Sequence, residues 1–90
     1  MAPLSDDEAR KRLSALRGWE IDGDRLRKRY TLESFPAAIA FVRRVAELAE
    51  AADHHPDILI EYKNVTLTLT THDSGGLTAR DFSLAARIDA

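Results

Sequence analysis

The hydrophobic periodicity of the chain changes abruptly at Pro56, and this change limits the folds that the sequence can adopt. Over residues 35–52, apolar side chains recur every three or four positions, which is the spacing of an amphipathic helix. A proline disfavours helical geometry at the residue before it and has no amide hydrogen to donate. We therefore expect a long helix that reaches about Asp53 or His54 and a different kind of structure after it.

The residues that follow Pro56 favour β-structure. Residues 58–62 and 65–71 are rich in β-branched side chains and flank Lys63-Asn64, a short link suited to a hairpin. In the second run apolar residues alternate with threonines, so the two faces of the strand differ. Continuing this period of two places His72 on the threonine face.

The remaining elements are predicted from capping and turn signals. Serine or threonine precedes each predicted helix, where its hydroxyl can accept from an unpaired backbone amide. The segments are a capping box at Ser5-Asp6-Asp7-Glu8 with a helix to about Leu16, a hairpin of residues 19–21 and 25–32 around Asp22-Gly23-Asp24, the long helix capped by Ser34, and a final helix over residues 82–88 after the cap at Thr78-Ala79-Arg80-Asp81.

This element order predicts an α+β fold, αββαββα, in one domain spanning residues 1–90. Two hairpins without a long crossover favour a four-stranded antiparallel sheet with three helices on one face. The long helix carries two adjacent apolar stripes, more than a sheet alone needs, which is a hint of self-association. A domain of this size also leaves much of its surface exposed, so association would stabilise it.

Composition narrows the classes of function. The formal net charge is −2 and the pI about 5.9, so the chain has no overall positive field for nucleic acid and we expect no nucleic-acid partner. Cysteine is absent, which excludes disulfides and thiolate metal sites. No apolar stretch approaches the roughly 20 residues that span a bilayer, and no signal segment is recognisable. We expect a cytoplasmic protein without a membrane partner.

All three histidines are candidates for proton chemistry, since imidazole titrates near neutral pH. His54 and His55 lie at the predicted helix-to-strand corner, and pairing of the two strands that follow brings His72 back towards it. Glu50 precedes His54 by four residues, so on a continuing helix its carboxylate can orient that imidazole. His55 projects about 100° away around the helix, so the two rings are expected to have different roles.

Other interpretations of these residues stay open at this stage. A single histidine at a helix end is commonly a capping or surface residue, and Asp81 fits the acid of a capping box better than a binding residue. A metal site is the sharper competitor, because Asp53, Asp57 and Asp73 lie close to the histidines in sequence. Against it, the adjacent imidazoles diverge and no H-E-x-x-H motif is present.

The sequence resembles the pterin-4a-carbinolamine dehydratase family. The resemblance is carried by Glu50-Ala51-Ala52-Asp53-His54-His55-Pro56, Tyr62, Thr71-His72, Gly76-Leu77-Thr78 and Asp81, and continues upstream through Gly18-Trp19 and the apolar pattern of the long helix. It implies the αββαββα fold, assembly as a homodimer or homotetramer through helices and sheet edges, and dehydration of 4a-hydroxytetrahydropterin to quinonoid dihydropterin. It implies neither a metal nor a redox cofactor.

Carried onto this chain, the resemblance implies three catalytic histidines: His54 and His72 as acid and base, with His55 helping to bind the pterin. The substrate-binding positions that it implies are Glu50, Asp53, Thr70, Thr71 and Asp81. Ile58 departs from the pattern, because many members have a tryptophan there. Some animal relatives also serve as dimerisation cofactors of a transcription factor, so a protein-interaction module is the alternative function.

Overall fold

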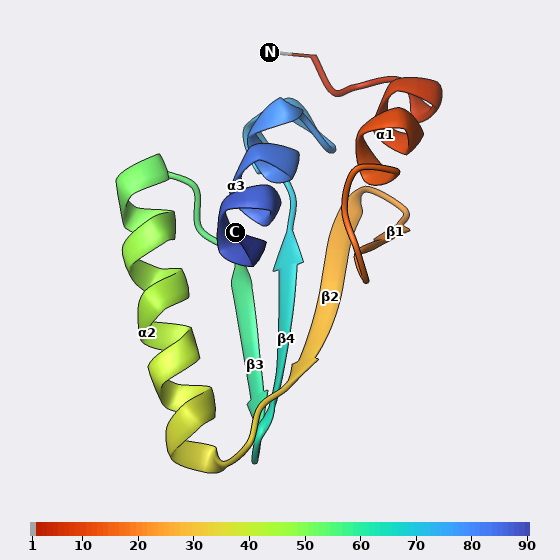
Figure 1. The fold of residues 1–90 in the computed structure, drawn as a ribbon. Coiled ribbons are helices and arrows are strands. Elements are labelled where there is room, and N and C mark those ends of the chain that lie inside the picture. The colour runs from red at the N-terminus through yellow and green to blue at the C-terminus, as the bar shows by residue number, and fades with distance from the viewer. Residues whose placement is uncertain (1) are drawn as a thin grey trace.

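The computed structural model describes residues 2–90 and has the predicted element order, with one additional short 3-10 helix (Figure 1). The elements are α1 (Asp6–Leu13), β1 (Glu20–Asp22), β2 (Arg25–Thr31), α2 (Phe35–Ala52), β3 (Asp57–Glu61), β4 (Asn64–Leu69), the 3-10 helix η1 (His72–Ser74) and α3 (Ala79–Asp89). The predicted α+β fold with a four-stranded antiparallel sheet is thus confirmed.

The sheet has the strand order β1-β2-β4-β3, and all neighbouring strands are antiparallel. Pairing of β2 with β4 joins the two hairpins and aligns Leu26 with Leu69 and Tyr30 with Val65. In Figure 1, α2 and α3 lie over one face of this sheet, and α1 lies near the turn between β1 and β2. The carboxyl-terminal hairpin therefore has β4 in the interior of the sheet and β3 at its edge.

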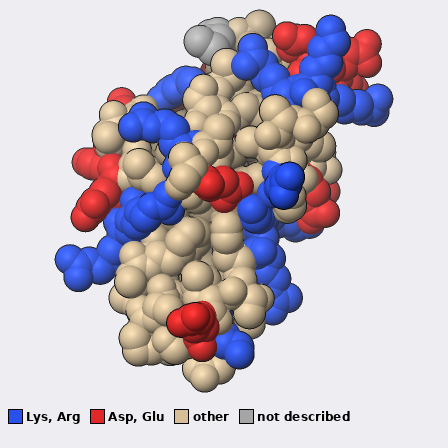
Figure 2. Space-filling model, in the orientation of Figure 1, with Lys and Arg blue, Asp and Glu red and all other residues tan. Residues whose placement is uncertain are grey.

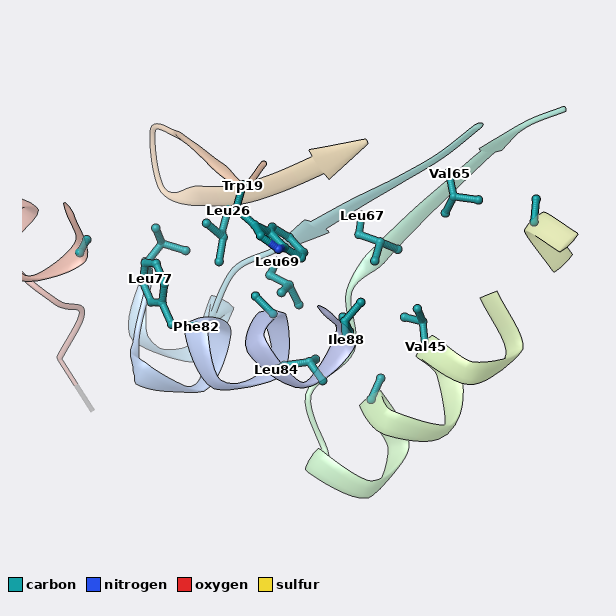
Figure 3. Packing of buried hydrophobic residues seen from close by; sticks show 14 residues of the cluster. Trp19, Leu26, Val45, Val65, Leu67, Leu69, Leu77, Phe82, Leu84 and Ile88 are labelled. Carbon is teal, nitrogen blue, oxygen red and sulfur yellow. The ribbon is translucent and has the colours of Figure 1, made fainter. Parts of the chain in front are cut away.

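The core lies between the sheet and the helices. Leu26, Leu67 and Leu69 are fully buried on the sheet, and Figure 3 shows them on the side that faces the helices, with Ile88 of α3 and Val45 of α2 opposite Leu67. Burying a leucine or valine stabilises the fold by roughly 1.5–3 kcal/mol. This packing fixes the position of α3 against β4 and the end of α2.

A carboxylate at the end of α3 ties that helix to the amino-terminal half of the chain. Asp89 accepts hydrogen bonds from the Trp19 indole at 2.7 Å, the Tyr30 hydroxyl at 2.5 Å and the Lys28 ammonium at 3.1 Å. Burial alone would raise the pKa of Asp89, but these three donors outweigh it and lower the pKa. Burial, together with the hydrogen bond to Asp89, raises the pKa of Tyr30.

Several predicted boundaries were wrong by a few residues. The first helix ends at Leu13 instead of Leu16, because the next turn is held by shorter bonds such as that from the Leu16 amide to the Leu13 carbonyl. In the second hairpin Asn64 pairs with Glu61, so the turn is Tyr62-Lys63, with Tyr62 in the left-handed region at φ 57°. Such two-residue turns match the twist of the strands.

The surface bears charges of both signs. Figure 2 shows Lys and Arg interspersed with Asp and Glu on the visible face, with a largely uncharged area in its lower half, over the first turns of α2. Within residues 2–90, no helix combines the length and the apolar character that a membrane crossing requires.

Candidate active site

The corner that carries His54 and His55 is built by an abrupt helix end. Asp53, the C-cap of α2, takes the left-handed conformation at φ 50° and ψ 44°, and the His54 amide donates back to the Ala49 carbonyl at 3.1 Å. The chain therefore leaves the helix axis before the histidines. Their side chains follow the direction of the corner and not that of the helix.

The predicted partnership of Glu50 with His54 is wrong for this reason. Spacing of four residues brings side chains together only on a continuous helix, and α2 has already ended at Ala52. Glu50 Oε1 instead lies 2.7 Å from His55 Nε2. Both side chains of this pair are largely exposed, at 81% for Glu50 and 59% for His55.

His54 is held by a residue from the last helix. Its side chain is buried, and Nε2 lies 2.5 Å from Oδ1 of Asp81, whose side chain is inaccessible to solvent. Asp81 belongs to the first turn of α3, 27 residues further along the chain. A hydrogen bond between an imidazole and a carboxylate is among the stronger ones in proteins.

The second oxygen of Asp81 joins this pair to the end of β4. Oδ2 accepts from the Thr71 hydroxyl at 2.8 Å and from the Thr78 amide at 2.9 Å, and the two threonine hydroxyls are 2.8 Å apart. Because the Thr71 hydrogen is directed at the carboxylate, the Thr78 hydroxyl donates to Thr71. Asp81 is therefore both the acid of the α3 capping box and the partner of His54.

This network determines which nitrogen of His54 is available. An ionised carboxylate can only accept, so Nε2 of His54 carries a hydrogen and donates it to Asp81. Nδ1 is then the nitrogen that can take up or release a proton. By the same reasoning Nε2 of His55 donates to Glu50, and Nδ1 of His55 is the nitrogen left to contact a ligand.

His72 lies beyond the end of β4 and not within a strand. The β3–β4 ladder ends where Asp57 pairs with Thr68, and beyond it Thr71 and His54 are linked through Asp81, which bonds to both. Thr71 then bridges to Gly76, and His72 opens η1 with its side chain exposed. The residue before His72, Thr71, is joined to the corner by the hydrogen bond from its hydroxyl to Asp81.

Two other predicted substrate-binding residues, Thr70 and Asp53, make hydrogen bonds to other parts of the chain. The Thr70 hydroxyl donates to the Asp24 carbonyl at 2.7 Å, and the Asp53 carbonyl accepts from Arg80 at 2.6 Å. Ile58 is 36% exposed on the strand that follows the corner. Within the described chain, no cluster of three or more His, Asp or Glu side chains has the geometry of a metal site.

A cavity of about 250 Å³ adjoins His54 on the side of α2 and α3. It is lined by Ala52, His54, Ala79, Arg80, Ser83, Leu84 and Arg87. Two residues that contact the corner or its network were not predicted as site residues. Thr78 was predicted only as a helix cap and as part of the family pattern, and Arg80, which lines the cavity, had no local signal of a site role.

The αββαββα arrangement of this domain is the fold of the pterin dehydratases. A crystal structure of a transcriptional coactivator/pterin dehydratase from Brucella melitensis superposes with a TM-score of 0.91 at 32% identity, covering 97% of this chain and 95% of that one. The profile of the pterin 4 alpha carbinolamine dehydratase family matches residues 2–90, and the chain belongs to this family.

Sequence relatives agree with this assignment. A Roseiflexus protein provisionally named pterin-4-alpha-carbinolamine dehydratase is 60% identical over 86 residues, which is 96% of this chain and 92% of the relative. A similarly named Chloroflexus aurantiacus protein is 53% identical over 89 residues, covering 99% and 96%. A pterin dehydratase-like protein identified as a RuBisCO assembly factor in the alpha-carboxysome shares the fold more distantly, with a TM-score of 0.64, 28% identity and coverage of 79% and 82%.

Proposed function

We propose that the protein is a lyase that dehydrates 4a-hydroxytetrahydropterin to quinonoid dihydropterin by histidine acid and base catalysis, and thereby recycles the pterin cofactor of aromatic amino acid hydroxylases. The observation that carries the proposal is the buried His54–Asp81 pair in a chain that belongs to this family. The carboxylate fixes one tautomer of His54 and stabilises the cation that forms when its ring takes up a proton. A histidine held in this way suits repeated proton transfer.

The reaction needs two proton transfers and no net change of oxidation state. The bond from carbon 4a to the hydroxyl oxygen breaks, and a proton delivered to that oxygen releases water. A ring nitrogen next to the carbon loses its proton, and the electrons of that N–H bond form the new C=N bond. One imidazole acts as acid and another as base, each contributing typically 10²–10⁴-fold.

We assign these two roles to His54, through Nδ1, and to His72. His55, steadied by Glu50, is assigned to binding the pterin. Because His72 is exposed at the start of η1, its ring is free to approach a ligand placed at the corner. The Thr71–Asp81–His54 contacts support the proposal by joining the two segments that carry these rings.

The test is the rate of 4a-hydroxytetrahydropterin breakdown by wild type, His54→Gln and His72→Ala. Glutamine at position 54 can still donate to Asp81 but cannot transfer a proton, so it separates catalysis from folding. We expect a loss of roughly 10²–10⁴-fold in each variant, and a near-normal rate in the exposed-surface control Glu47→Gln. Wild-type rates in both histidine variants would end the acid and base assignment.

A protein-interaction role is the second candidate, favoured by the resemblance to the RuBisCO assembly factor. Such a role predicts that wild type lacks dehydratase activity and retains a heterologous partner through extensive purification. Activity at a normal enzymatic rate, with only the protein's own oligomer recovered, would count against it.

We also propose that the protein is a homo-oligomer. The edge strand β3 is exposed along its whole length, with Leu59 at 54% and the following turn residue Tyr62 at 68%. Phe35, at the start of α2, is 48% exposed. Unpaired strand edges with apolar side chains favour pairing with another chain.

A further inference from the structure

The conformation of Asp53 determines where His54 and His55 point, and it is not a relaxed one. Residues other than glycine adopt the left-handed region at a cost of roughly 1–2 kcal/mol, less for Asp and Asn. The cost must be offset by contacts that hold the corner. Asp53 has such a contact at its carbonyl, to which Nη2 of Arg80 donates at 2.6 Å.

Together with a second hydrogen bond, this contact holds both polar groups of one peptide unit. The peptide between Asp53 and His54 has its oxygen bonded to Arg80 and its amide hydrogen bonded to the Ala49 carbonyl at 3.1 Å. With both ends held, rotation of this peptide requires that both hydrogen bonds break. The direction in which the His54 side chain leaves the backbone is set by this plane.

Arg80 also adjoins Asp81, so a single turn of α3 contacts the corner twice. Asp81 holds the ring of His54 through Nε2, and Arg80 holds the peptide that precedes that ring. One contact holds the ring of His54, and the other holds its backbone. Loss of either would let the Nδ1 atom move relative to a bound substrate.

We propose that Arg80 is a positioning residue for the two histidines at the corner, acting through the Asp53 carbonyl. The inference deepens the proposed dehydratase function and rests on it. Arg80 itself is exposed, and exposed charged contacts stabilise folds by at most about 1 kcal/mol. The proposal therefore predicts that its removal affects catalysis more than stability.

The kinetic test compares Arg80→Met, Arg80→Lys and the control Arg43→Met, an exposed arginine in the middle of α2. Methionine keeps the apolar stem without a donor, and lysine restores one. We expect kcat to fall about 10-fold in Arg80→Met with KM within about threefold, and partial recovery in Arg80→Lys. If Arg80 only bound substrate, KM would rise while kcat stayed the same, and the proposal would be wrong.

A double substitution tests whether Arg80 acts through the Asp53 carbonyl. Glycine adopts the left-handed conformation freely, so in an Asp53→Gly protein the corner needs less support from Arg80. Adding Arg80→Met to Asp53→Gly should therefore lower kcat less than it does in wild type. An equal fall in both backgrounds would show that Arg80 does not act through this peptide.

A readout independent of activity separates this inference from the function on which it rests. Hydrogen exchange of the His54 amide, measured by NMR, should be about 10-fold faster in Arg80→Met than in wild type and unchanged in Arg43→Met. Unchanged exchange would overturn the positioning role even if the enzyme were active. Faster exchange in a protein without dehydratase activity would support the role and reject the proposed function.

Discussion

The Asp81→Asn substitution tests the site most directly, because it changes one atom of the buried network. The Thr71 hydroxyl and the Thr78 amide both donate to Oδ2, at 2.8 and 2.9 Å. The single amide oxygen of asparagine must remain there, so its NH₂ group turns towards His54. A donor then faces Nε2, and His54 must move its hydrogen to Nδ1 to accept it.

The expected loss of stability follows from the hydrogen bond that is replaced. A charge-assisted bond worth about 1.5–3 kcal/mol becomes a neutral one worth about 0.5–1.5 kcal/mol, so unfolding should become easier by about 1–2 kcal/mol. The effect on catalysis is larger, because the hydrogen of neutral His54 now occupies the nitrogen needed for proton transfer and no carboxylate stabilises the cation. We expect kcat/KM to fall on the order of 10²–10⁴-fold.

The assay combines dehydratase kinetics, denaturant unfolding and ¹⁵N NMR of the histidine rings. Glu47→Gln is the control, since it makes the same carboxylate-to-amide change at an exposed position of α2 outside the proposed site. Exposed charges contribute about 0–1 kcal/mol, so stability and kcat/KM should change little there. An Asp81→Asn protein with wild-type kcat/KM, or with the hydrogen still on Nε2 of His54, would refute the reasoning.

Two further predictions concern the rest of the molecule. The folded state lowers the pKa of Asp89 below its usual 3.8, so its stabilisation is present above that value and is lost as pH falls through the lowered pKa. Asp89→Asn should therefore cost about 1–2 kcal/mol in denaturant unfolding at pH 7, and progressively less as the pH falls below 3.8. The exposed Glu33→Gln is the control, and a pH-independent difference would contradict this. Leu59→Lys, on the exposed edge strand, should reduce the mass measured by light scattering to that of a smaller species, whereas Ala15→Lys should not, and an unchanged mass would exclude β3 from the interface.

The sequence by itself determined the elements of this fold, because its strongest signals are local. The caps at Ser5, Ser34 and Thr78 each accept a backbone amide hydrogen, as predicted from residue type and spacing alone. Pro56 separates helix from strand, and the alternation in β4 predicted its buried face. Each signal depends on neighbours within a few residues, which the chain carries whatever its tertiary structure.

Only the tertiary structure decided which groups meet at the site. Spacing predicted Glu50 as the partner of His54, yet one left-handed residue, Asp53, redirected that carboxylate to His55. The partner of His54 is Asp81, and the support of its backbone is Arg80, both from a helix whose position is set by packing against α2 and the sheet. A side-chain direction depends on the sum of such distant contacts, whereas a helix start depends on four adjacent residues.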